Sequence, residues 1–160
     1  MNNKKTKNIS AQKLGKHFKI IFLIWLGLLA VSAVFYFIEI DICLFSTFFL
    51  GAGLGIWFLF DEKLLQSDKH YIYCLLISIA FLAYSLLLKH SLDTKPDTEF
   101  AGMIPLCLLA VQRPTRLLCK HYFKQEPIFR GSLSGGDFIY TIVLSTSLFG
   151  LPLIIMMLLK

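Results

Sequence analysis

The sequence has few charged residues, and their distribution excludes an ordinary water-soluble fold. Asp, Glu, Lys and Arg make up 16% of the 160 residues, against about 25% in an average soluble domain. Hydrophobic residues make up 56%, and the mean hydropathy is +0.68. Charge is absent from four long runs, which are Ile20–Ile38, Cys43–Phe60, Tyr71–Leu88 and Phe138–Leu159. Runs of this length cross a bilayer as helices, so the sequence predicts an all-α, multi-pass transmembrane bundle.

Other absences exclude particular chemistries. The interiors of these runs hold no Asp, Glu, Lys, Arg or His, and such residues usually mark ion or proton paths, so proton-coupled transport is not expected. The four cysteines form no C-x-x-C pair, and the four histidines have no zinc-like spacing. No serine or cysteine has a recognisable base and acid partner. We therefore predict no catalytic residue, no metal site and no cofactor.

A fifth apolar run, Phe100–Val111, is short, and the basic residues decide whether it crosses. Lys and Arg near helix ends prefer the cytoplasmic side. Five crossings place 6 + 2 + 5 = 13 of them inside and 3 outside, whereas four crossings place 9 inside and 7 outside. We predict five spans and a cytoplasmic N-terminus. The predicted spans are about 20–38, 43–60, 71–88, 97–112 and 138–159.

Two hydrophilic segments flank this single bundle of residues 20–160. Residues 1–19 are basic and are expected to be largely disordered, and the first span is too long to be a cleaved signal peptide. In the loop 113–136, Pro114 and Pro127 bracket an expected amphipathic helix, Thr115–Glu126. The basic residues of the loop are Arg113, Arg116, Lys120, Lys124 and Arg130. They predict a cytoplasmic topology anchor or, as the alternative, a patch that binds anionic phospholipid headgroups or docks a protein.

Three glycines in "FFLGAGLGIWF" resemble the start of a nucleotide-binding loop, but they lie inside a span with no strand, lysine or acid beside them. Thr47, Gly51 and Gly55 instead recur every four residues. Ridges of small residues let membrane helices approach closely, so these residues predict a helix-packing face. The partner is either another helix of this chain or a second copy.

Two prolines lie inside predicted spans. Pro105 and Pro152 each remove one backbone hydrogen bond. Proline-broken spans can mark a transporter site, but the polar partners of such a site are missing here. We interpret both prolines as helix kinks. In "GSLSGGDF", Asp137 is expected to cap the last helix.

These features predict a small, non-enzymatic interaction protein of the bacterial cytoplasmic (inner) membrane, either an accessory subunit or an immunity-type protein. The expected partners are the lipid bilayer with its anionic headgroups, a membrane or secreted protein, and a second copy of the chain, with no nucleic acid. The first alternative is a small-solute permeation module lined by Ser78, Ser85, Ser145 and Ser147. The second is a lipid-modifying enzyme that uses Asp61, Glu62, His70 and His121 at the interface.

Overall fold

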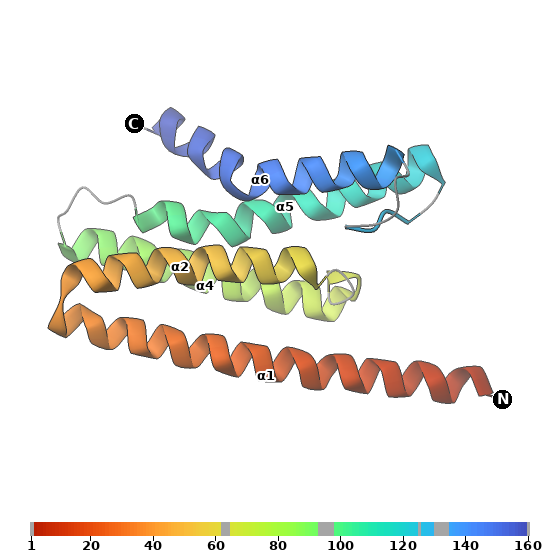
Figure 1. Ribbon diagram of the computed structural model, residues 1–160, viewed down its shortest axis with the longest axis horizontal. Helices are drawn as coiled ribbons and strands as arrows, with labels where there is room; N and C mark the ends of the chain where they lie inside the picture. The colour runs from red at the N-terminus through yellow and green to blue at the C-terminus, as the bar shows by residue number, and fades with distance from the viewer. Residues whose placement is uncertain (1, 62–64, 93–97, 125, 130–134, 160) are drawn as a thin grey trace. The chain divides into compact units, whose positions relative to one another are not determined.

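The computed structural model describes residues 2–61, 65–92, 98–124, 126–129 and 135–159, and within these ranges every regular element is an α-helix. The five described helices are α1 (Asn2–Ile38), α2 (Ile40–Phe60), α4 (Asp68–Leu92), α5 (Thr98–Phe123) and α6 (Gly135–Leu159). The order of the helices along the chain can be followed in Figure 1. The predicted all-α fold is confirmed.

The chain divides into two compact units, Met1–Cys43 and Leu44–Lys160. The first unit contains α1 and the first turn of α2. Only Glu39 separates these helices, and backbone hydrogen bonds continue on both sides of it. Its N–H donates to the carbonyl of Phe35 over 2.8 Å, and its carbonyl accepts from the N–H of Cys43 over 3.2 Å.

Residues 2–19, for which the sequence predicts a largely disordered segment, belong to α1 in the structure. Lysine, glutamine, alanine and leucine are good helix formers, and the segment contains no proline. The apolar half of α1 supplies the helical turns from which these residues extend, so the costly nucleation step is not needed again.

Four helices are long and apolar enough to cross a membrane: Gly15–Ile38, Ile40–Phe60, Asp68–Ser91 and Gly135–Leu158. They coincide with the four uncharged runs of the sequence. The chain is thus a multi-pass helical membrane protein. α5 is not among the four, although its 26 residues extend for about 39 Å at 1.5 Å per residue.

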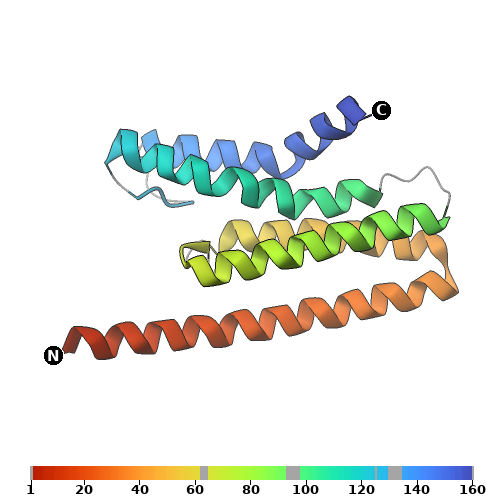
Figure 2. The same ribbon diagram turned by 180° about the vertical axis from the view of Figure 1, so that it is seen from behind.

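α5 occupies the interior of the second unit. It lies between α6 on one side and α2 with α4 on the other (Figures 1 and 2). Ala101, Ile104, Leu108 and Leu109 are at most 1% exposed. Polar Glu99 and Gln112 are buried as well. Neighbouring helices, rather than lipid, cover much of the surface of α5. This helix can therefore have a lower hydropathy than its neighbours.

The structure corrects the predicted break at Pro114. Pro105 and Pro114 both lie within the continuous helix α5, so no separate helix runs from Thr115 to Glu126. Membrane helices tolerate proline where neighbours satisfy the released backbone groups. α5 ends at Phe123, and the next residue, Lys124, has the left-handed φ of 53° that commonly terminates helices.

α6 bends along its length, and the part toward the C-terminus turns away from the direction of the first turns (Figures 1 and 2). Pro152 lies within this helix and cannot donate to the carbonyl of Leu148. A proline is the usual cause of such a bend.

Candidate functional site

Gly51 of α2 makes a very close contact with a neighbouring helix of the second unit. A side-chain carbon at this position would overlap the carbonyl oxygen of Ala101 in α5, and it would lie 3.0 Å from Cε1 of Phe81 in α4. One turn later, a carbon at Gly55 would lie 2.8 Å from Cγ2 of Ile104. Only the absence of side chains at these glycines allows such contact.

The Ala101 carbonyl that faces Gly51 is the group that Pro105 leaves without its usual helical donor, because residue i bonds the carbonyl of residue i−4. A glycine Cα–H directed at a carbonyl is a weak hydrogen bond of the kind found between packed helices. The small-residue ridge of α2 and the proline of α5 thus meet at one point. Thr47, the third residue of the ridge, is fully buried.

A second glycine contact was not predicted from the sequence. A side-chain carbon at Gly102 of α5 would lie 2.8 Å from Cα of Leu82 and 2.9 Å from Oγ of Ser85, both in α4. The signal was present, since Ala101 and Gly102 are adjacent small residues in the fifth span.

Three buried serines of the second unit direct their hydroxyl groups into their own helices. Ser78 donates to the carbonyl of Cys74 over 2.8 Å, Ser85 to that of Phe81 over 2.9 Å, and Ser147 to that of Leu144 over 2.9 Å. Ser145, the fourth residue of the predicted permeation path, is exposed on α6. Three of the four serines are thus buried, whereas the fourth is exposed.

An ion pair lies where α4 ends and α5 begins. Lys89 donates to Oε1 of Glu99, whose side chain is 12% exposed, and Oε2 of Glu99 has no hydrogen-bond partner. Beside the pair, the hydroxyl of Thr98 donates to the carbonyl of Ser85 over 3.1 Å. These contacts fasten the start of α5 to the last turns of α4.

The opposite end of the second unit is basic, and we call it the basic end; it comprises residues 113–124 with the first turns of α4 and α6. Nη2 of Arg113 lies 2.5 Å from Oδ1 of Asp68, and its guanidinium lies 5.1 Å from the ring centroid of Tyr71. The hydroxyl of Tyr71 donates to the carbonyl of Leu109 over 3.0 Å. α4 and α5 are thus joined by three polar contacts at this end.

The rest of the predicted basic patch is only partly free. Arg116 pairs with Glu126, and Nζ of Lys120 lies 3.9 Å from the same carboxylate. The hydrogen bond from Arg116 is the main reason that the pKa of Glu126 is below its ordinary value. Lys124 is exposed just beyond the helix end, and Arg130 lies outside the described residues. Exposed ion pairs of this kind contribute about 0–1 kcal/mol each.

The segment 126–129 is held against the ends of two helices. The ring of Phe129 meets that of Phe60 edge to face, with centroids 5.8 Å apart. Asp137, in the first turn of α6, accepts the backbone N–H of Ile128 over 2.8 Å. Its carboxylate therefore holds the described segment 126–129 against the start of α6.

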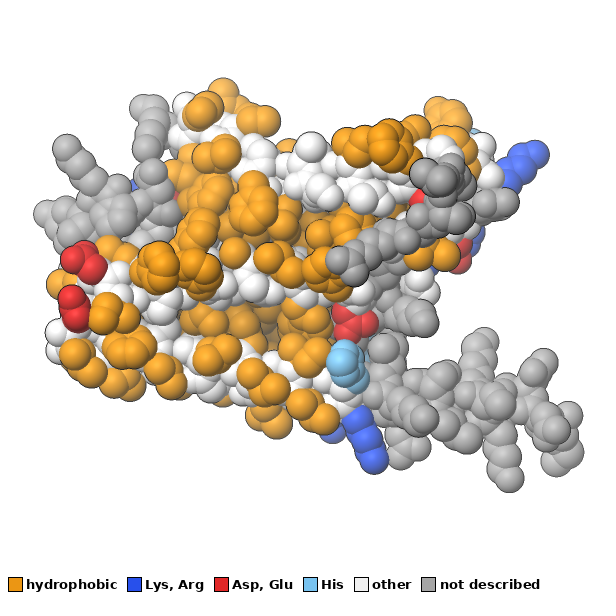
Figure 3. Space-filling view, viewed as in Figure 1, with side chains coloured by type: hydrophobic (Ala, Val, Ile, Leu, Met, Phe, Trp, Pro, Cys, Tyr) orange, Lys and Arg blue, Asp and Glu red, His pale blue; other side chains and the backbone are white. Residues whose placement is uncertain are grey.

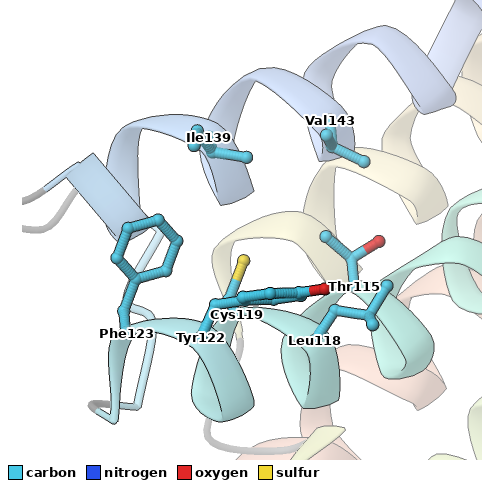
Figure 4. Close-up of a pocket in the computed structure, with 7 residues that line it drawn as sticks. All are labelled: Thr115, Leu118, Cys119, Tyr122, Phe123, Ile139 and Val143. Atoms are coloured by element: carbon cyan, nitrogen blue, oxygen red, sulfur yellow. The ribbon is translucent and has the colours of Figure 1, made fainter.

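A groove of about 620 Å³ runs between α5 and α6 at the basic end (Figure 4). Ile139 and Val143 of α6 point toward the face of α5 that carries the other lining residues. Those residues are Thr115, Leu118, Cys119, Tyr122 and Phe123. The lining is mainly apolar, and the sulfur of Cys119 points into the space between the helices. Burial, reinforced by the negative charge of Asp137, raises the pKa of the Cys119 thiol.

Of the four residues proposed for lipid chemistry, Asp61, His70 and His121 belong to the described parts of the chain. No three His, Cys, Asp or Glu side chains there are grouped as metal ligands would be. His121 is exposed and stacks edge to face on Tyr122, while Glu62 lies outside the described residues. All four cysteines are buried, and none forms a disulfide.

No protein-family description, curated protein or solved structure matches this chain. The class of the protein, a multi-pass helical membrane bundle, therefore rests on its own residues and helices.

Proposed function

We propose that the protein is a small integral membrane protein that acts by binding another protein through its surface, as an accessory subunit or an immunity-type protein of the bacterial cytoplasmic membrane. One observation supports this proposal above the others: three buried serine hydroxyls of the second unit are used within their own helices, and its tightest described glycine contact is made between helices. Ser78, Ser85 and Ser147 donate to carbonyls of their own helices, and glycine, proline and backbone carbonyl meet at the α2–α5 contact.

The surface offers what a membrane partner would contact. Hydrophobic side chains cover much of the middle of the visible face of the second unit, whereas charged side chains lie toward the ends of its helices (Figure 3). In the first unit, Leu23 is 65% exposed and Phe37 is 85% exposed. A face of this kind is compatible with lipid and with a second membrane protein.

The proposal includes a topology with the N-terminus inside and five crossings. Its support is the distribution of Lys and Arg, which favours five crossings over four, together with the interior position of α5. A helix that its neighbours enclose needs less apolarity than one that faces lipid.

Photo-crosslinking in native membranes tests the proposed function. A photoreactive residue is placed at Leu23 or Phe37, and a matched one at Leu148, which is 4% exposed. We expect a crosslinked protein adduct of constant mass from an exposed position and none from Leu148. Only lipid adducts at both exposed positions, with no stoichiometric protein after gentle purification, would contradict the proposal.

A further inference from the structure

We infer that Arg116 and Lys120 of α5 form a binding site for a phosphate anion, and that the carboxylate of Glu126 occupies this site as an internal competitor. The anion is the phosphate of an anionic phospholipid headgroup or a free phosphate ion. The inference does not depend on the proposed protein partner, because it concerns the chain and a small anionic group.

The two cations lie on one face of α5. Arg116 and Lys120 are four residues apart in this helix, a spacing at which side chains are neighbours on the helix surface. Nη2 of Arg116 donates to Oε1 of Glu126, and Nζ of Lys120 lies 3.9 Å from Oε2. Each carboxylate oxygen thus faces one cation. The planar guanidinium matches the geometry of phosphate as well as that of carboxylate.

The local fold brings Glu126 back to these cations. α5 ends at Phe123, and Lys124 has a left-handed φ of 53°. A residue in this conformation commonly ends a helix and redirects the chain. Glu126 consequently reaches Arg116, which is ten residues earlier in the sequence. The competitor is therefore supplied by the turn that terminates α5.

The segment 126–129, which begins with this glutamate, is held in place by two other contacts. The N–H of Ile128 donates to Oδ1 of Asp137 over 2.8 Å. The ring of Phe129 meets that of Phe60 with centroids 5.8 Å apart. Such tethers give the carboxylate a high effective concentration at the two cations. It can therefore occupy the site without binding tightly.

The contacts of Glu126 are weak enough for an external anion to replace them. The side chains of Arg116, Lys120 and Glu126 are 23%, 59% and 43% exposed, and exposed ion pairs contribute about 0–1 kcal/mol each. The hydrogen bond from Arg116 is the main reason that the pKa of Glu126 lies below its ordinary value. The carboxylate is therefore charged at neutral pH and competes with other anions.

The position of the site along α5 suits a lipid headgroup. Arg116 and Lys120 follow directly after the proposed span 97–112, where basic residues meet the headgroup layer. With Glu126 in place, the site presents one net positive charge instead of two. Displacement of this carboxylate thus increases the attraction of this end of α5 for phosphate.

The test measures binding of two ligands by the purified, delipidated full chain in detergent. Native mass spectrometry follows phosphatidylglycerol, and isothermal titration calorimetry follows inorganic phosphate. Glu126→Gln removes the competing charge and keeps the size of the side chain. We expect the apparent affinity for phosphatidylglycerol, for inorganic phosphate or for both to rise about five-fold, the factor that corresponds to one charge near an anionic surface. A rise for phosphatidylglycerol alone assigns the site to headgroups, and a rise for inorganic phosphate assigns it to the free ion. Unchanged affinity for both ligands would overturn the inference.

Two comparisons separate loss of the competitor from a general change in charge. Asp137→Asn changes the net charge equally at the same end of the second unit, but the described hydrogen bond of Asp137 is to the Ile128 N–H. It should raise the affinity less than Glu126→Gln does. On an Arg116→Gln background, Glu126→Gln should lose most of its effect, because the guanidinium that it would release is absent. If Arg116→Gln fails to fold, Lys120→Gln takes its place. Equal gains in either comparison would refute the inference.

Discussion

Gly51 of α2 lies against the carbonyl oxygen of Ala101 in α5, the oxygen that Pro105 leaves without its usual donor. A residue that lacks a side chain and a residue that lacks an N–H thus form one contact between two helices. Helix packing therefore accounts for Gly51, and a nucleotide-binding role is not needed to explain this glycine.

Gly51→Ala is expected to destabilise the protein by about 1–3 kcal/mol, because the added carbon overlaps backbone that cannot move independently. Gly53→Ala is the matched control, since nothing lies within 4 Å of its missing side chain. The control should be neutral or gain up to about 1 kcal/mol from reduced backbone freedom. Thermal unfolding in detergent measures both. An equal midpoint for the two variants would show that the contact is looser than described.

Tyr71→Phe removes the hydroxyl that donates to the carbonyl of Leu109. Loss of one such bond between membrane helices typically costs roughly 0.5–1.5 kcal/mol, so the unfolding midpoint should fall modestly. Tyr122→Phe serves as control, because its side chain is exposed and its ring contact with His121 survives the change. If the unfolding midpoint fell equally in both variants, the Tyr71 hydroxyl would make no specific contribution to stability.

Cys119 should react slowly with iodoacetamide at neutral pH, because only the thiolate reacts and burial with Asp137 raises the pKa of the thiol. The measurement uses a background in which the other three cysteines are replaced by alanine. The alkylation rate should continue to rise at pH values above the pKa of an ordinary cysteine thiol. Asp137→Asn removes one cause, so its rate profile should move to lower pH.

The control for this titration is Glu126→Gln, which removes a carboxylate that does not contribute to the Cys119 pKa. Its profile should coincide with that of the parent protein. The Asp137→Asn variant should fold, because asparagine keeps a side-chain oxygen that accepts the Ile128 N–H. An unchanged profile in Asp137→Asn would mean that burial alone sets the pKa.

Five crossings with the N-terminus inside predict that Lys120→Cys, on a cysteine-free background, escapes a membrane-impermeant maleimide added to intact cells. The same position should react after permeabilisation, since the Lys120 side chain is 59% exposed. His90→Cys, at an exposed position near the far end of α4, should react without permeabilisation. The reverse pattern would establish the opposite topology for these positions.

The sequence predicted the apolar helices well because their surfaces face lipid and their composition reports that directly. It predicted less about α5, where Ala101, Gly102 and Glu99 face other helices and the local pattern is set by contacts distant in sequence. Pro114 was interpreted as a helix boundary because the contacts of Tyr71 with Leu109 and Arg113, just before the proline, join segments far apart in the sequence and cannot be seen in the local pattern. The α5–α6 groove was missed for the same reason.

The composition of α5 has a consequence for biogenesis. With a buried glutamate near its start, a buried glutamine near its middle and two internal prolines, this helix would partition poorly into a bilayer as an isolated segment released from the translocon. α2 and α4 precede it along the chain, and α6 follows it. Stable insertion of α5 therefore requires that the earlier helices still be close to the exit site, which couples synthesis of the middle of this protein to its assembly.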